Sequence, residues 1–357
     1  MARGFVTVKK VKTISLILVV LMLAMSLTAC GGAKNDSSSQ SQQGSSEPEY
    51  TLQLAGAYPS TGDTPRAKAS VMIKDLIEKK SNGKIKVELY LDSQLGGDRE
   101  TLESCQAGNI AMVSLTTAPA VNFIPKLAVF DIPMLFDNLD TAKKVLSGEF
   151  REKLAQEYEK AGFKLLLMVP ISYREMTANK AINNINDFKG IKIRTMENKY
   201  HMEFWKNLGA NPTPLNFSEL YIALQQGTVD AQENPYDILL ANKFYEVQKY
   251  INHTHHIAFV HTVVMNKNLY DSMPDEYKKI IDESMNEVSE FLFNESKAQN
   301  ENMLSELKNK GMQVVELSED VKAKMKEAAD KVAEMVRKDV GSDFVDELFK
   351  AIEEAKK

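Results

Sequence analysis

Cysteine is nearly absent from this sequence: only Cys30 and Cys105 occur in 357 residues. Only Cys105 remains after Cys30, which excludes a framework of intramolecular disulfides. We therefore expect Cys105 to be a small packed residue near a helix. The sequence indicates no redox chemistry.

The sequence also lacks the short motifs of common catalytic sites. It contains no Gly-x-Ser-x-Gly turn, no phosphate-binding loop and no His-Glu-x-x-His pair. No pair of carboxylates stands out among its 49 acidic residues. We expect a protein that is not an enzyme and that uses no cofactor.

Only one long apolar run occurs, over residues 14–27, and four basic residues but no acidic one precede it. The run is shorter than the ~20 apolar residues of a membrane span, so it predicts a signal peptide. It ends in Leu27-Thr28-Ala29-Cys30, which resembles a bacterial lipoprotein box. That resemblance implies cleavage after residue 29 and lipid attachment at Cys30. The alternative is an ordinary signal peptide with an incidental cysteine.

Residues 30–49 contain few apolar side chains, with six serines and three glutamines between Gly31 and Glu49. Such a segment cannot bury enough surface to fold, so we expect a flexible tether between the lipid and the folded part. The predicted location is extracytoplasmic and lipid-anchored to the cell membrane, at the outer face of the cytoplasmic membrane or in the periplasm.

Basic residues are fewer than acidic ones, 44 against 49. The formal net charge is −5, and removing residues 1–29 takes away four positive and no negative charges, which gives −9. An acidic chain of this kind argues against binding to nucleic acid.

From Tyr50 onward, apolar alternation and helical periodicity follow one another along the chain, which predicts an α/β fold. About 308 residues remain, enough for two lobes of ordinary domain size. Residues 275–310 lack glycine and proline, so one long or kinked helix is expected there. The predicted strands are 51–57, 84–91, 110–115, 163–169, 191–194 and 257–265. The predicted helices are 65–80, 100–107, one or two over 139–160, 198–208, 217–226, and a helical region after Val315.

A series of short motifs then occurs in a fixed order. They are Ser93-Gln-Leu-Gly-Gly97, Pro133-Met-Leu-Phe136, Gly190-Ile-Lys-Ile-Arg194, Leu208-Gly-Ala210, Phe217-Ser-Glu-Leu-Tyr-Ile-Ala-Leu-Gln-Gln-Gly-Thr-Val-Asp230 and Gln232-Glu-Asn-Pro235. Each motif is weak alone, but together they resemble the DctP-type solute receptors of tripartite ATP-independent (TRAP) transporters, across nearly the whole chain after the tether.

The resemblance implies a two-lobed α/β fold that closes over an organic anion, with a long helix shared by both lobes. We assign residues 50–171 and 260–300 to lobe I, and residues 172–259 and 301–357 to lobe II. It also implies partners: a small organic acid as ligand, and the membrane subunits of a permease driven by an ion gradient. The third expected partner is the lipid bilayer, through Cys30.

An anion that leaves water for a closed cleft needs a counter-charge, and the guanidinium fork of arginine matches a carboxylate. Arg194, at the end of a short predicted strand, resembles the carboxylate clamp of the family. Arg174 resembles a second arginine that many members use. The resemblance also implies a ligand hydrogen bond from Asn234 and an aromatic contact from Phe217. Outside the family, such arginines usually form surface ion pairs and such asparagines build turns.

Weaker candidates lie at the ends of predicted lobe I strands, where open α/β sheets bind ligands. These are Tyr58, Thr116 and Thr117. Glu233 could orient an arginine, meet a ligand hydroxyl or face solvent. For the ligand, uronates and other sugar acids are favoured, C4-dicarboxylates come next, and keto acids stay open.

A different function would follow from the histidines His253, His255 and His256, which suggest a metal-ion receptor. Their spacing argues against it. On a strand, His253 and His255 would share one face and His256 the other, and no carboxylates form an obvious cage around them.

Overall fold

The computed structural model describes residues 47–61 and 63–357. Its strands form one mixed sheet in the order β2-β1-β3-β8-β4-β7-β5-β6, with β9 paired to β8. Cys30 and residues 1–46 lie outside the described residues, so the predicted signal peptide, lipid site and most of the tether do too. The strands are β1 (Tyr50–Gly56), β2 (Ile85–Tyr90), β3 (Met112–Thr116), β4 (Phe163–Ala178), β5 (Lys192–Thr195), β6 (Asn211–Pro214), β7 (Ala231–Asn234), β8 (Tyr250–Asn266) and β9 (Gln313–Glu316).

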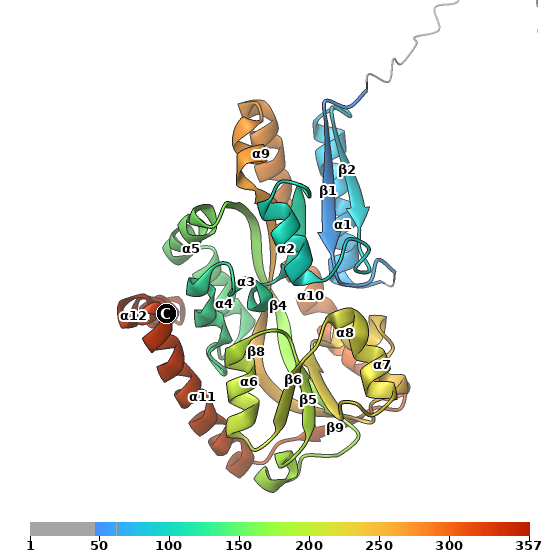
Figure 1. The fold of residues 1–357 in the computed structure, drawn as a ribbon, viewed down its shortest axis with the longest axis vertical. Helices are drawn as coiled ribbons and strands as arrows, with labels where there is room; N and C mark the ends of the chain where they lie inside the picture. The colour runs from blue at the N-terminus through green and yellow to red at the C-terminus, as the bar shows by residue number, and fades with distance from the viewer. Residues whose placement is uncertain (1–46, 62) are drawn as a thin grey trace, which may run out of the picture. The chain divides into compact units, whose positions relative to one another are not determined.

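Helices cover both faces of this sheet (Figure 1). They are α1 (Pro65–Lys80), α2 (Asp98–Gln106), α3 (Thr117–Ala120), α4 (Leu139–Leu146), α5 (Glu149–Lys160), α6 (Lys199–Asn207), α7 (Leu220–Gln225), α8 (Tyr236–Ala241), α9 (Lys267–Ser272), α10 (Asp275–Asn309), α11 (Glu319–Val340) and α12 (Ser342–Ala355). Short 3-10 turns lie at Pro125–Asp131, Ile185–Phe188, Phe217–Glu219 and Phe244–Glu246.

The two long strands β4 and β8 connect the two ends of the sheet (Figure 1). At one end, β3 pairs with residues 261–265 of β8; at the other, β7 pairs with residues 175–178 of β4. The β4–β8 register shifts at Leu165/Leu167 and Arg174/Met176, near the two ends, and at Pro170/Ser172 in the stretch between them. Such bulges bend a strand and increase its twist. The predicted lobe boundaries at residues 171/172 and 259/260 fall in this stretch and stay a prediction.

The expected long helix is confirmed as α10, which runs unbroken for 35 residues. It packs against α1, β4 and α8, and so contacts both ends of the sheet. The start of α1 also follows the prediction. The Thr64 side chain accepts a hydrogen bond from the Ala67 amide at 3.3 Å, and Pro65 occupies the first turn, where its missing N–H is harmless.

Several predicted elements differ in extent. The strand predicted at 163–169 is the first part of β4, which has 16 residues in all. The strand predicted at 257–265 is the last part of β8, which has 17 residues in all. Polar residues of the site interrupt their apolar pattern, which hid the rest from sequence reasoning. The region 139–160 forms two helices, and 217–226 forms a 3-10 turn followed by the short helix α7. None of the helices in the described part is long and apolar enough to span a membrane.

Candidate functional site

A small cavity lies where the loops after several strands meet near the middle of the sheet. Its volume is about 40 Å³, counted as space for the centres of water molecules, which is room for a few waters. Charged and polar side chains line it together with apolar ones. The lining residues are Ala57, Tyr58, Arg66, Asp98, Leu115, Thr116, Arg174, Arg194, Met196, Phe217, Asn234, Ile238 and Phe259.

Arg194 reaches this cavity from β5 and is only 2% exposed. Its Nε and Nη2 donate to the Leu215 carbonyl oxygen at 2.9 and 2.6 Å, which fixes the plane of the guanidinium. Burial lowers the pKa of Arg194 to about 10, so the group stays charged at neutral pH. Within residues 47–61 and 63–357 it forms no ion pair. Arg194 is thus a buried, oriented cation whose charge is not matched by a contacting carboxylate.

Arg174, on β4, is held from one side by Glu233 on β7. The Arg174 Nε contacts Glu233 Oε2, and its Nη2 donates to Glu233 Oε1 at 2.9 Å and to Asn234 Oδ1 at 3.0 Å. The remaining nitrogen, Nη1, is buried and has no hydrogen-bond partner among the described residues. Since a buried donor without a partner is unfavourable by about 1–3 kcal/mol, an acceptor entering the cavity would relieve that penalty.

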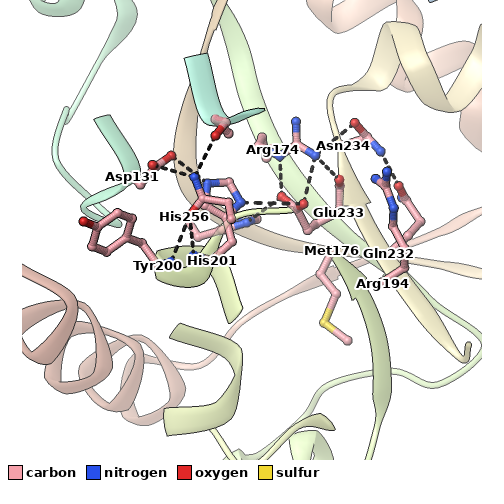
Figure 2. Close-up of polar contacts among 12 residues, drawn as sticks. Asp131, Arg174, Met176, Arg194, Tyr200, His201, Gln232, Glu233, Asn234 and His256 are labelled. Atoms are coloured by element: carbon pink, nitrogen blue, oxygen red, sulfur yellow. Dashed lines mark hydrogen bonds and ion pairs between the residues drawn. The ribbon is translucent and has the colours of Figure 1, made fainter. Parts of the chain in front are cut away.

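Behind Glu233 lies a chain of buried polar groups, which Figure 2 shows on the side away from Asn234. His256 Nε2 lies 3.0 Å from Glu233 Oε2, and His201 Nδ1 lies 4.0 Å from Oε1. His201 Nε2 in turn lies 2.9 Å from Asp131 Oδ1. Burial alone would raise the pKa of Glu233, but the Arg174 charge and the His256 hydrogen bond outweigh it and hold the pKa well below its usual range. Glu233 is therefore the fixed counter-ion of Arg174 and does not line the cavity.

Asn234 and Phe217 complete this side of the cavity. The Asn234 side-chain amide donates to Gln232 Oε1 at 2.6 Å while its oxygen accepts from Arg174, so both ends of the side chain are fixed. The Phe217 ring lies with its centroid 5.9 Å from the Arg194 Cζ, a cation–π geometry.

Of the three ligand residues predicted in lobe I, two line the cavity and one does not. Tyr58 lines the cavity, and its hydroxyl hydrogen-bonds Ser70 Oγ at 2.7 Å and Ser114 Oγ at 2.8 Å. Thr116 also lines the cavity, whereas Thr117 is buried at the start of α3 and does not. The structure thus brings six of the eight predicted ligand residues to one cavity, with Glu233 directly behind it.

Sequence reasoning missed two charged residues of the cavity, Arg66 and Asp98. Arg66, in the first turn of α1, pairs with Asp237 of α8 through an Nε–Oδ2 distance of 2.8 Å, and both side chains are buried. Its guanidinium lies between the rings of Tyr58 and Phe259, at 4.9 and 5.3 Å. Asp98 is the first residue of α2. Both residues lie in the first turn of a helix, where charged side chains are common. Their charge was the only signal in the sequence that could have indicated a place in the cavity.

The three neighbouring histidines do not converge on one point. His253 Nε2 lies 2.7 Å from the Tyr236 hydroxyl, and the His253 and His255 rings contact each other with centroids 5.3 Å apart. His256 is stacked on Phe204, and the His255 side chain is 53% exposed. In the described ranges no three His, Cys, Asp or Glu side chains come together as a metal site. The geometry gives no support to the metal-receptor alternative. Cys105 is buried at the end of α2, as expected.

Glu175, next to Arg174 but on the opposite side of β4, provides a test by pH. Burial raises its pKa to about 8, against the effect of the His255 and Thr254 amides. Because this exceeds the unfolded value near 4.3, the folded protein keeps a proton that the unfolded chain loses, so stability falls as pH rises from about 4.3 to 8. We expect Glu175→Gln to raise the unfolding free energy at pH 8 by about 2–5 kcal/mol, and by under ~1 kcal/mol at pH 4. Denaturant titrations at both pH values measure this.

The matched control is Glu301→Gln, an exposed carboxyl on α10. It should change stability equally little at both pH values, within ~0.5 kcal/mol. Equal effects of Glu175→Gln at the two pH values would mean that folding leaves the pKa of Glu175 unchanged.

Residues 56–339 match the DctP family model, described as "Bacterial extracellular solute-binding protein, family 7". The chain belongs to this family. Its members are transport proteins rather than enzymes, so the expectation of a non-enzyme is confirmed, as is the TRAP-receptor resemblance. As a DctP-family protein, the chain also has the two-lobed α/β fold that was predicted.

Curated relatives of this DctP-family chain include the C4-dicarboxylate-binding protein DctP of Rhodobacter capsulatus, 30% identical over 79% of this chain and 86% of that protein. A solute-binding protein of Verminephrobacter eiseniae is 38% identical, but the match spans only 56% of this chain and 59% of that protein. Among solved structures, the sugar acid binding protein DctPAm of Advenella mimigardefordensis, in complex with galactonate, is 31% identical with a TM-score of 0.83, covering 87% of this chain and 99% of that one.

Proposed function

We propose that this protein is the extracytoplasmic receptor of a TRAP transporter and that it binds the carboxylate of a small organic acid between Arg174 and Arg194. The observation that carries the proposal is the buried Arg194 guanidinium, held in plane by a carbonyl and without an ion-pair partner in the described structure. Beside it, Arg174 Nη1 is a second buried donor that lacks a partner. Two such donors around one cavity suit a carboxylate, which accepts through both oxygens.

Asn234 and Phe217 are proposed to complete the carboxylate site, with Tyr58 and Thr116 on the opposite wall. Since the cavity holds only a few waters, a ligand of four to six carbons needs the lobes to part. The ligand would then favour the closed form because it contacts both lobes only there. The Arg66–Asp237 pair, which joins α1 to α8 across the cavity wall, would form on closure.

Among organic acids we favour sugar acids, uronates or aldonates, over C4-dicarboxylates. Solved relatives of similar identity point both ways: one holds galactonate at 31% identity and another holds succinate at 28%. The proposed partner is the membrane part of a TRAP permease. A lipid on Cys30 is proposed to keep the receptor at the membrane surface, since two or more acyl chains anchor a protein durably.

A thermal-shift screen of the purified protein tests this function. The panel contains uronates, aldonates, C4-dicarboxylates, keto acids and divalent metal ions. We expect one class of acid, at a hundred times its Kd, to stabilise the fold by about 2.7 kcal/mol and raise the melting temperature by about 5 °C. A panel in which no acid raises it, or in which only a metal ion does, would contradict the proposal.

A further inference from the structure

The charged groups around the cavity are nearly balanced before any ligand enters. Of its three arginines, Arg66 is paired with Asp237 and Arg174 with Glu233, while Arg194 contacts no carboxylate within the described residues. Apart from Asp98, which is treated next, these five groups leave one positive charge, that of Arg194. One carboxylate of a ligand is enough to neutralise it.

A further carboxylate, Asp98, already faces the same cavity. Asp98 also lines the adjoining pocket beside Phe217, Met196 and Arg194, which extends the cavity by about 30 Å³. Its side chain forms no hydrogen bond or ion pair with any described residue, although Arg194, Arg66 and Arg174 all lie near enough to lower its pKa. Asp98 therefore stands in the cavity as an unengaged acceptor.

We propose that Asp98 determines specificity: it accepts a hydrogen bond from a hydroxyl group of the ligand and repels a second carboxylate, so the ligand is a monocarboxylic hydroxy acid. This rests on the proposed function of the same site. An ionised carboxyl can only accept hydrogen bonds, and a hydroxyl is the donor that a sugar acid offers. A dicarboxylate would instead bring two charges to one unpaired arginine and place the second near Asp98.

The discrimination follows from the small, water-poor cavity. Like charges brought together in such a place lower affinity strongly, whereas the same approach in bulk water would be screened. The fold itself does not decide this point, because relatives with succinate and with D-erythronate have nearly equal TM-scores of 0.79. The choice of ligand must therefore depend on the side chains that line the cavity rather than on the fold.

Burial raises the pKa of Asp98 to about 6, opposed by Arg194 and Arg66. The groups that face it are Arg66 from α1, Arg174 from β4, Arg194 from β5 and Glu100 from its own helix. We therefore assign to Asp98 the pH dependence of dicarboxylate binding around this value. Rejection of a dicarboxylate should be strong at about pH 8 and weaker at about pH 5.5, where Asp98 is mostly neutral.

The experiment compares acids that differ only in the far carboxylate: galactonate with galactarate, and erythronate with meso-tartrate. Calorimetric titrations of the parent protein at about pH 8 should give at least ~100-fold tighter binding of the monocarboxylate in the pair that fits the cavity. In Asp98→Asn, which keeps the size of the side chain, this ratio should shrink at least ~10-fold. Lowering the pH to about 5.5 should decrease this affinity ratio in the parent protein but not in the Asp98→Asn variant.

The matched control is Glu103→Gln, an exposed acid on the same helix that does not line the cavity, and it should leave the ratio unchanged. If succinate, tartrate or galactarate binds the parent better than the hydroxy acids, or if Asp98→Asn leaves the ratio as it was, the specificity role of Asp98 is refuted while the receptor function stands. If no organic acid of any kind binds, both the role and the receptor function are refuted.

Discussion

Replacing Arg194 by alanine should weaken binding of the organic acid at least ~100-fold, which corresponds to about 3 kcal/mol. The expected size follows from the desolvated carboxylate that would be left in the cavity with no matching cation. It also follows from the loss of an oriented fork, because the Leu215 carbonyl holds the guanidinium in place before the ligand arrives. Calorimetric titration with the acid identified in the thermal-shift screen measures the loss.

Two further variants separate binding from folding. Arg194→Lys keeps the charge but not the planar fork, so we expect an intermediate loss. Lys192→Ala removes an exposed cation from the same strand and should change affinity by less than twofold. The clamp assignment would be wrong if Arg194→Ala kept the parent affinity while retaining a cooperative melting transition.

Glu233→Gln should lower the unfolding free energy by about 3–5 kcal/mol, since it removes one partner of a buried ion pair and leaves Arg174 uncompensated. Glutamine keeps the shape of the side chain, so packing is little changed. Ligand binding should weaken as well, because Arg174 loses the contacts that fix its direction. Denaturant unfolding at neutral pH measures the first effect.

The stabilisation by Glu233 depends on pH in a defined direction. Its folded pKa lies below the unfolded value near 4.3, so the contribution is fully present above about pH 5 and is lost as the pH falls through the acidic range. The parent should therefore lose its advantage over Glu233→Gln in acid. The control is Asp230→Asn, three residues before Glu233 in the chain. Asp230 is a half-exposed ion-pair partner of Lys192, so its replacement should change the unfolding free energy by under ~1 kcal/mol at either pH. Similar losses for both variants would argue against a special buried pair.

Much of the fold could be predicted because local signals agreed with the final structure. The Thr64-Pro65 start of α1, Gly209 after α6 with φ +91°, and the uninterrupted stretch that forms α10 each have a local physical cause. The second half of β4 and the first half of β8 could not be predicted in this way. There the strand residues Arg174, Glu175 and His256 are polar and buried, and tertiary contacts rather than periodicity keep them extended.

The site shows the same division. Arg174, Arg194 and Asn234 were found because they stand in recognisable motifs, and the structure brings them to one cavity. Of the three roles left open for Glu233, orienting an arginine is the one that agrees with its buried contacts to Arg174. Arg66 was missed because its inward direction depends on Asp237, 171 residues later in the chain. Asp98 was missed because an acid at the start of a helix is common for reasons of the helix dipole alone.

The separation between Arg66 and Asp237 also bears on how the protein folds. Each helix and most turns can begin to form from neighbouring residues, whereas this pair and the cavity around it require segments from α1, α2, β4, β5 and α8 to be in place together. Contacts between distant segments are reached slowly, because the entropy of closing long loops is lost before they form. Ligand is therefore expected to recognise only chains that have nearly completed folding, and its presence would slow unfolding far more than it would speed refolding.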